Sequence, residues 1–192
     1  MASGLWTRKA NLRSRLEIAD AICITIIASI LFLTLIFRTG YVHGSSMEST
    51  IHEGDRYIIS NLFYKPKQGD IVVFLPDKEQ TNTYDNEKLY VKRVIAVSGQ
   101  RVQIKKDVTA TYKVFVDDIE INEPYLDDDQ VTNPPVGQEE LDITVPDGYI
   151  FALGDNRKNS NDSRAIGCVD ERRIIGHVIF RFYPFNQIGP VR

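Results

Sequence analysis

The chain has 192 residues, of which 43% are hydrophobic and 26% are charged, a composition that excludes wholesale disorder and collagen-like structure. Its formal net charge of −3 lacks the basic excess that proteins use to bind nucleic acid. Cys23 and Cys168 lie far apart, and the three histidines show no zinc-ligand spacing, so neither a disulfide framework nor a metal site is predicted.

The first 20 residues differ in charge from the rest of the chain. They hold four basic residues against two acidic ones, a net charge of +2, and the basic residues are Arg8, Lys9, Arg13 and Arg15. The remaining residues hold 19 basic and 24 acidic side chains, a net charge of −5. Because basic residues beside a membrane segment tend to stay in the cytoplasm, residues 1–20 are predicted to be a cytoplasmic N-terminal segment.

The least polar part of the chain follows directly. Residues 21–37 contain no charged residue, proline or glycine, and as a helix they would span roughly 25 Å, slightly less than the hydrocarbon core of a bilayer. A buried core helix would normally show a polar face, and a cleaved signal peptide would have small residues where this chain has Arg38 and Thr39. The segment 21–38 is therefore predicted to be an uncleaved transmembrane anchor, with residues 39–192 as an extracytoplasmic domain.

After the anchor, the hydrophobic pattern changes to short runs of Val, Ile, Tyr and Phe that are separated by turn residues. Strands are predicted at 56–60, 71–75, 89–97, 101–105, 112–116, 119–121, 142–145, 149–153 and 174–182. Asp117 and Asp118 are predicted to form a two-residue hairpin turn, and Pro146-Asp147-Gly148 is a strong turn signal. The sequence thus predicts a mostly β, antiparallel domain that is large enough for its own core.

The first candidate catalytic residue is Ser46, just beyond the anchor. A serine hydroxyl is a weak nucleophile and needs a base within hydrogen-bond reach. His43 precedes it by three residues, but closeness in sequence does not by itself bring a base to a hydroxyl. A serine at a turn or strand end is the alternative interpretation.

The second candidate is Lys92, in the predicted strand 89–97. Side chains alternate along a strand, so Lys92 is predicted to share a face with Val94 and Ala96, while Arg93 points the other way. Burial among apolar neighbours would lower the pKa of this lysine, and a neutral amine can act as a general base. An exposed lysine that discourages aggregation at a sheet edge is the alternative.

The third candidate is a polar loop at residues 154–164, between two predicted strands. Asp162 and Arg164 could form a pair there, and Ser160 could hydrogen-bond a neighbouring amine. A solvated surface loop is the alternative. The acidic run at residues 127–129 also marks a loop, and it is predicted to be a solvated face rather than a ligand site.

Together the three segments resemble those of the type I signal peptidases, the membrane-bound Ser-Lys endopeptidases that remove signal peptides from exported proteins. The matching residues are Ser46-Met47 with Thr50, the run from Tyr90 to Ile95, and the run from Gly154 to Arg157 with Ser160 and residues 162–164. The resemblance extends from the anchor nearly to the end of the chain. The single anchor and the short middle region are similar to the compact form common in Gram-positive bacteria.

The resemblance implies roles for the matching residues. Ser46 would be the nucleophile, with its backbone N–H as one donor to the oxyanion, and Lys92 would be the general base. Ser160 would hydrogen-bond the Lys92 amine and orient it. The residues that would hold the loop framing the site are Asp155, Asp162 and Arg164. No metal or cofactor is implied, because lysine supplies the base.

The chain departs from the family pattern at two positions. Many members have proline where this chain has Ser49, so the loop is expected to be less rigid. Some members have a serine two residues before the nucleophile, whose hydroxyl helps to bind the oxyanion. This chain has Gly44 there, so that side-chain donor is absent.

The resemblance implies preproteins bearing signal peptides as substrates, bound extended against strand edges. Membrane lipid would hold the enzyme and its substrates in one plane, which raises their effective concentration. Two other readings are a self-cleaving Ser-Lys regulator of the SOS-repressor type and a catalytically inactive, membrane-anchored β domain. The first would need a DNA-binding domain, and three complete motifs argue against the second.

Overall fold

The structure is a computed structural model that describes residues 3–77 and 88–191, with side chains described at 15–34, 36–77 and 88–191. It contains two compact units, Met1–Arg38 and Thr39–Arg192. The side chains of Arg8, Lys9 and Arg13, which carry much of the topology prediction, lie outside the described residues.

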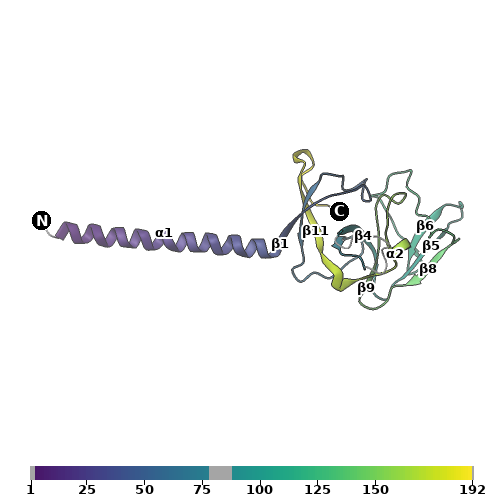
Figure 1. Ribbon diagram of the computed structural model, residues 1–192, viewed down its shortest axis with the longest axis horizontal. Helices are drawn as coiled ribbons and strands as arrows, with labels where there is room; N and C mark the ends of the chain where they lie inside the picture. Colours follow the sequence, from purple (N-terminus) through teal and green to yellow (C-terminus); the bar gives the residue numbers. More distant parts are fainter. Residues whose placement is uncertain (1–2, 78–87, 192) are drawn as a thin grey trace. The chain divides into compact units, whose positions relative to one another are not determined.

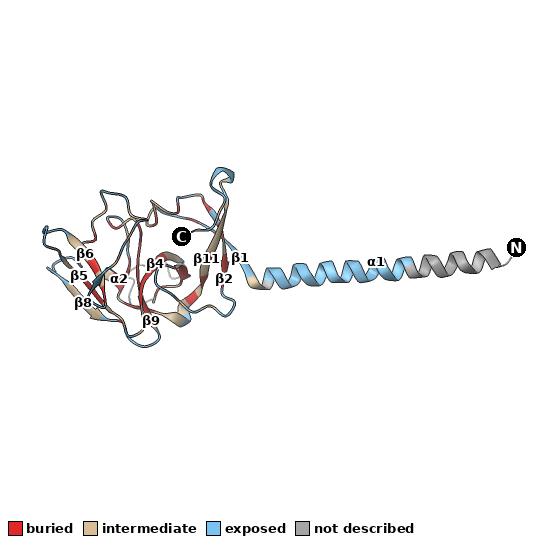
Figure 2. Ribbon diagram, turned by 180° about the vertical axis from the view of Figure 1, so that it is seen from behind, coloured by how far each residue is buried: buried red, intermediate tan, exposed pale blue. Residues whose placement is uncertain are grey.

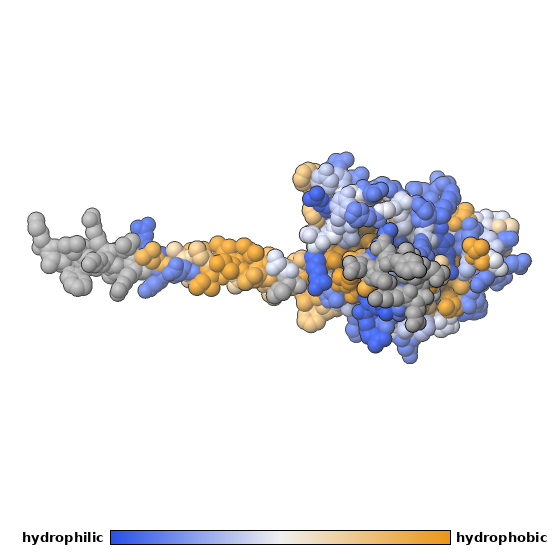
Figure 3. All heavy atoms as spheres, in the orientation of Figure 1, coloured by the Kyte–Doolittle hydropathy of each residue, from blue (hydrophilic) through white to orange (hydrophobic). Residues whose placement is uncertain are grey.

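The first unit is the helix α1, Ser3–Ile36. It is longer than the predicted anchor at 21–38, because the preceding polar residues contain no proline and continue the helix. It also ends sooner, since Phe37 and Arg38 already belong to a strand. Its segment Arg15–Thr34 is long and apolar enough to cross a membrane, and Figure 3 shows apolar residues covering the helix beyond a hydrophilic stretch at the start of this segment.

The second unit is built almost entirely of strands (Figure 1). The strands are β1 Phe37–Tyr41, β2 Arg56–Ser60, β3 Ile71–Phe74, β4 Tyr90–Val97, β5 Arg101–Lys106, β6 Tyr112–Val116, β7 Ile119–Glu120, β8 Leu141–Thr144, β9 Tyr149–Leu153, β10 Val169–Asp170 and β11 Ile174–Tyr183. The helical turns are α2 Ser163–Ile166, η1 Glu171–Arg173 and η2 Phe185–Gln187. All nine predicted strands are present within one or two residues of their predicted ends, whereas β1 and β10 were not predicted.

The strands form two sheets. The larger has seven strands in the order β1-β2-β11-β3-β4-β9-β10, and the smaller has four in the order β7-β6-β5-β8. The pairings from β2 to β10 and within the smaller sheet are antiparallel. The predicted fold class, a mostly antiparallel β domain with one N-terminal apolar helix, is therefore confirmed.

The turn between β6 and β7 shows why the strand prediction worked. Asp117 and Asp118 have φ values of 52° and 66°, the left-handed conformation that a two-residue hairpin with the native strand twist requires. Phe115 pairs with Glu120 and Val116 with Ile119 across it. The predicted hairpin is confirmed.

Strand β4 lies in the interior of the larger sheet, between β3 and β9. Its middle residues are buried on both faces, and Figure 2 shows buried residues following the strands while the loops are largely exposed. The register with β9 is interrupted between Val94 and Ala96. Val94 consequently packs with Val72 and Phe74, whereas Ile95 and Ala96 both join the cluster that contains Phe151. The prediction that Lys92, Val94 and Ala96 share one face is thus wrong beyond Val94, because strict alternation fails at a bulge.

Candidate active site

Ser46 lies in a tight turn that is held in place by the packing of the next residue into the hydrophobic core. The next residue, Met47, is 1% exposed and packs with Ile51, Tyr57 and Val73. Two hydrogen bonds close the turn, because the Thr50 and Ile51 amides both donate to the Met47 carbonyl, at 3.0 and 2.9 Å. The buried methionine therefore sets the position of the serine beside it, which is a physical reason for the Ser-Met pair.

Lys92 projects from β4 toward this turn. Its side chain is 3% exposed, and its Nζ donates to Ser46 Oγ at 2.6 Å and to the Val91 carbonyl at 3.1 Å. The Nζ also lies 5.2 Å from the centre of the Tyr90 ring. The structure thus brings together two residues that lie 46 positions apart in the sequence, at a distance that permits direct proton transfer.

Burial lowers the pKa of Lys92 from its ordinary value of 10.5 to about 8, because the ammonium form loses its hydration. Asp162 and Asp155 oppose this shift by favouring the charged form. Each of these carboxylates is itself paired with an arginine, Arg164 and Arg93 respectively, so little negative charge remains to hold a proton on the amine. About half of the Lys92 side chains are therefore neutral near pH 8, and about one tenth near pH 7.

Two further groups near Ser46 bear on its chemistry. The Ser46 backbone N–H donates to no acceptor within residues 3–77 and 88–191, so it is available to a bound oxyanion. His43 lines the same cavity and packs edge-on against Tyr41. In the described part of the chain it makes no hydrogen bond to Ser46, so Lys92 is the better-placed base.

The loop at residues 154–164 follows β9 and forms hydrogen bonds to the backbone carbonyls of Ser45 and Ser46. Asn156 donates from its amide to the Ser46 carbonyl at 3.1 Å and from its side chain to the Ser45 carbonyl at 3.0 Å. Asn159 donates to Ser45 Oγ at 2.8 Å. Ser45 Oγ thus serves as an anchor for this loop, while Ser46 Oγ faces the lysine.

Asp155 is the point where the three predicted segments meet. It is fully buried and accepts two hydrogen bonds from Arg93, Nε at 2.9 Å and Nη2 at 2.7 Å. It also accepts from Thr50 Oγ1 at 2.5 Å. One carboxylate therefore links the Ser46 turn, strand β4 and the polar loop. This role of Arg93 and Thr50 was not predicted from the motifs, although the alternation of β4 directs Arg93 away from Lys92 and toward a buried partner.

Asp162 and Arg164 form the pair that the sequence suggested. Asp162 caps the short helix α2 by accepting from the Arg164 amide, and it also accepts from the Gly154 amide at 3.1 Å. The Arg164 guanidinium donates to both oxygens of Asp162 at 2.8 Å and to the Arg157 carbonyl at 2.8 Å. Both ends of the polar loop are therefore tied together, so this loop is ordered rather than a solvated excursion.

Ser160 does not make the expected hydrogen bond to Lys92 in this structure. Its Oγ is buried and has no hydrogen-bond partner in the described part of the chain. The hydroxyl lies against Gly154, as does the Ser46 carbonyl, since a Cβ atom at position 154 would collide with both. The orienting role of Ser160 stays a prediction.

Ser49, one of the two positions that depart from the expected family pattern, adopts a φ of +103°. A proline ring fixes φ near −65° and could not adopt this conformation. The Ser49 hydroxyl instead donates to Asp127 Oδ2 at 2.7 Å. The loop that was expected to be less rigid without proline is therefore held by a side-chain hydrogen bond.

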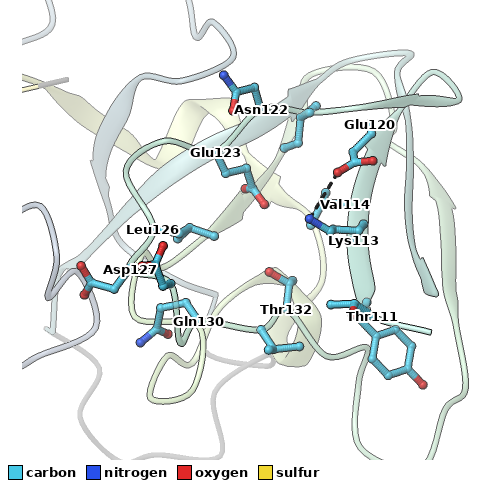
Figure 4. A pocket seen from close by; sticks show the side chains of 14 residues that line it. Thr111, Lys113, Val114, Glu120, Asn122, Glu123, Leu126, Asp127, Gln130 and Thr132 are labelled. Atoms are coloured by element: carbon cyan, nitrogen blue, oxygen red, sulfur yellow. Dashed lines mark ion pairs between the residues drawn. The ribbon is translucent and has the colours of Figure 1, made fainter. Parts of the chain in front are cut away.

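A cavity of about 670 Å³ opens onto Ser46 and Lys92. Its walls come from the segment 39–47, the segment 88–92, and the side chains of Tyr57, Asn159 and Asn161. A second cavity, of about 610 Å³, lies between the strands β6 and β7 and the segment 122–132 and does not include the candidate catalytic residues (Figure 4). The first cavity, which has the size of a typical ligand site, is the candidate active-site cleft.

Comparisons with known proteins agree with this reading. The family model described as "Signal peptidase, peptidase S26" matches residues 15–183. "Probable signal peptidase I-1" of Synechocystis sp. is 35% identical over 179 residues, covering 90% of this chain and 86% of the relative. "Signal peptidase I" of Bacillus licheniformis is 34% identical over 190 residues, covering 95% of both chains. "Signal peptidase IB" of Staphylococcus aureus is 34% identical over 162 residues, covering 76% of this chain and 78% of the relative.

The resemblance that rested on three short motifs is thus confirmed over most of the chain, and it includes relatives from Gram-positive bacteria. The described residues contain no cluster of His, Cys, Asp and Glu that could hold a metal ion. The chain belongs to the signal peptidase family, peptidase S26, and is a serine endopeptidase that cleaves signal peptides.

Proposed function

We propose that Ser46 and Lys92 form the catalytic dyad of this signal peptidase. The observation that carries the proposal is the 2.6 Å contact between Lys92 Nζ and Ser46 Oγ, made by a lysine that burial drives toward its neutral form. A buried lysine with a lowered pKa and a serine within hydrogen-bond reach have the geometry that nucleophilic catalysis requires.

In this mechanism, neutral Lys92 takes the Ser46 hydroxyl proton as Oγ attacks the carbonyl carbon before the scissile bond. The Ser46 N–H donates to the resulting oxyanion. The Lys92 ammonium then gives its proton to the departing amine, which leaves an ester on Ser46. Water, deprotonated by Lys92, hydrolyses this ester and restores both side chains. The lysine supplies the base at each stage, so the proposed steps involve no metal or cofactor.

Asp155, Asp162 and Arg164 are positioning residues in this proposal, because they act through other groups rather than on the substrate. Asp155 fixes Arg93 and Thr50, and Asp162 with Arg164 holds the loop that binds the Ser46 carbonyl. Ser160 would complete the set by turning toward the Lys92 amine when substrate fills the cleft. Its buried, unpartnered hydroxyl is consistent with a group that gains a partner in the working complex.

The substrates are preproteins that carry signal peptides, bound extended in the cleft between the segments 39–47 and 88–92. Backbone groups of these segments would pair with the substrate as an added strand. The segment 21–38, which is helical as far as Ile36, would anchor the enzyme in the lipid, with residues 1–20 in the cytoplasm and residues 39–192 outside. The anchor is supported by the helical segment Arg15–Thr34, whose length and composition are suited to crossing a membrane.

A cleavage assay tests the dyad. Detergent-solubilised enzyme is incubated with a labelled preprotein, and the product is identified by mass spectrometry. We expect wild type to release the signal peptide, Ser46→Ala to be inactive, and Lys92→Arg to be nearly inactive, because guanidinium stays charged. Ser45→Ala should retain substantial activity, and the exposed Lys65→Arg serves as a matched lysine control. Turnover by Lys92→Arg at the wild-type rate would exclude Lys92 as the base and favour His43.

A further inference from the structure

Residues 122–133, here named the bridging loop, run from the end of β7 toward β8 and form one wall of the second cavity. Figure 4 shows Glu123, Leu126, Asp127, Gln130 and Thr132 on one side of this cavity and Lys113 and Glu120 on the other. No bridging-loop residue is among those that line the active-site cleft in the described part of the chain. The loop nevertheless contacts the two segments that carry Ser46 and Lys92 and the polar loop that carries the proposed positioning residues.

Its first contact is with the Ser46 turn. Ser49 Oγ donates to Asp127 Oδ2 at 2.7 Å, and a hydrogen bond to a carboxylate is stronger than one between neutral groups. Ser49 holds a φ of +103°, a conformation that costs a non-glycine residue about 1 kcal/mol or more. Within residues 3–77 and 88–191, this is the one hydrogen bond between the turn and the bridging loop. It therefore compensates for a strained backbone three residues after the proposed nucleophile.

Its second contact is with strand β4. The centre of the Tyr125 ring lies 3.8 Å from the Arg93 guanidinium carbon, and Arg93 follows Lys92 directly. The stacked ring covers the arginine while the arginine binds Asp155. Planar stacking and two-pronged carboxylate binding are the interactions that arginine makes best, so the bridging loop helps to fix the strand that carries the proposed base.

Its third contact is with the polar loop at residues 154–164. Lys158 pairs with Asp129 at 2.6 Å. The Arg157 guanidinium, which is buried, pairs with Glu123 and donates to Thr132. The same loop binds the Ser46 carbonyl through Asn156. The contacts of Arg157 are buried and should resist change, whereas the Ser49 contact is exposed and separable.

We propose that the bridging loop sets the spacing between the proposed nucleophile and base, and that Ser49 and Asp127 are positioning residues for the reaction. This inference rests on the proposed dyad. Because the contact lies outside the cleft, its loss should displace Ser46 Oγ from Lys92 without removing any surface that binds substrate. The effect should consequently fall on kcat, while KM stays nearly constant.

Kinetics of matched variants test the coupling. Asp127→Ala removes the acceptor, Ser49→Gly removes the donor while tolerating the positive φ, and the double variant removes both. Each single change should lower kcat roughly 3- to 10-fold, since small displacements of reacting groups are costly, and the double variant should be no slower than the slower single. Ser49→Asn, which accepts a positive φ and can donate from its amide, should recover most of the activity lost in Ser49→Gly. Asp128→Ala, the neighbouring exposed carboxylate, is the control and should match wild type.

Hydrogen exchange tests the same inference without activity. The amides of Glu48, Thr50 and Ile51 are bonded within the Ser46 turn, and Asp127→Ala should raise their exchange several-fold, while peptides from β4 and β9 stay protected. Unchanged exchange in the turn, independent effects in the double variant, or equal losses in Asp127→Ala and Asp128→Ala would overturn the proposal. Failure of the proposed function would look different. The wild-type enzyme would then not cleave the preprotein, although Asp127→Ala would still raise hydrogen exchange in the Ser46 turn.

Discussion

Replacing Lys92 with methionine tests whether burial depresses the pKa of the proposed base. Methionine keeps an unbranched side chain but cannot ionise. Wild-type Lys92 is 3% exposed and its pKa lies at about 8 rather than 10.5. Between these values the unfolded chain holds a proton that the folded chain has released, so the free energy of unfolding rises with pH. Below pH 8 the folded protein carries the full cost of burying a charged Lys92, which lowers its free energy of unfolding. This cost disappears as the pH approaches 10.5, because the lysine is then neutral in the folded chain and loses its proton in the unfolded chain as well.

The magnitude follows from the two pKa values. Their difference corresponds to about 3 kcal/mol in total, of which about 2 kcal/mol is recovered between about pH 7 and about pH 9.5. Lys92→Met lacks this titration. Wild type should therefore gain about 2 kcal/mol of unfolding free energy relative to Lys92→Met over that interval. Taking the difference cancels the tyrosines and other groups that titrate in both proteins.

The measurement is urea unfolding of both proteins in the same detergent at several pH values, followed by tyrosine circular dichroism. The wild-type rate at low substrate concentration should rise about tenfold per pH unit below pH 8 and level off above it. A difference in unfolding free energy that stays constant with pH would refute the depressed pKa. A rate that levels off near pH 6.5, the ordinary range of histidine, would assign the base to another group.

Three further predictions concern the frame of the site and its topology. Arg93→Met should lower the free energy of unfolding by about 3–5 kcal/mol, because it leaves the Asp155 carboxylate buried without its partner; urea unfolding measures this, and Arg101→Met, at an exposed pair, should change little. Gly154→Ala should reduce kcat at least tenfold by pushing on the Ser46 carbonyl and Ser160 Oγ, whereas Gly189→Ala, which meets open space, should not; equal kcat values would contradict this reading. Protease added to cells stripped of their wall should digest residues beyond Arg38, and full protection of those residues with an accessible N-terminus would reverse the proposed orientation.

Most of the fold was predictable because its signals are local. The strands of the second unit alternate or form short apolar runs, and turn residues such as Asp117-Asp118 separate them. The two missed strands lack these signals. Strand β10 has only two residues, and β1 begins at the end of an apolar run with most of its residues exposed. The first residue of the helix was not predicted, since hydropathy reports an apolar stretch rather than where a helix begins.

The three motifs of the candidate site could be predicted from the sequence, but the hydrogen bonds that join them could not. Ser46, Lys92 and Asp155 stand out by residue type and by their resemblance to a family, but their contacts span dozens of residues and depend on how the strands pair. The bulge in β4 is one consequence, because it moves Ala96 away from the face of Lys92. The bond from Ser49 to Asp127 is another, since no local pattern joins residues 78 positions apart.

The sequence by itself determined the residue types of the site, the apolar helix and the strand pattern, because these depend on side-chain chemistry and on periods of a few residues. Only the tertiary structure decided that Lys92 is buried within 2.6 Å of Ser46, and that Asp155 joins the turn, the strand and the loop. Burial depends on what the whole chain packs around a group, and burial is what lowers the pKa of this lysine toward the range that the proposed base requires. The chemistry is therefore encoded in a few residues, whereas its activation is a property of the fold.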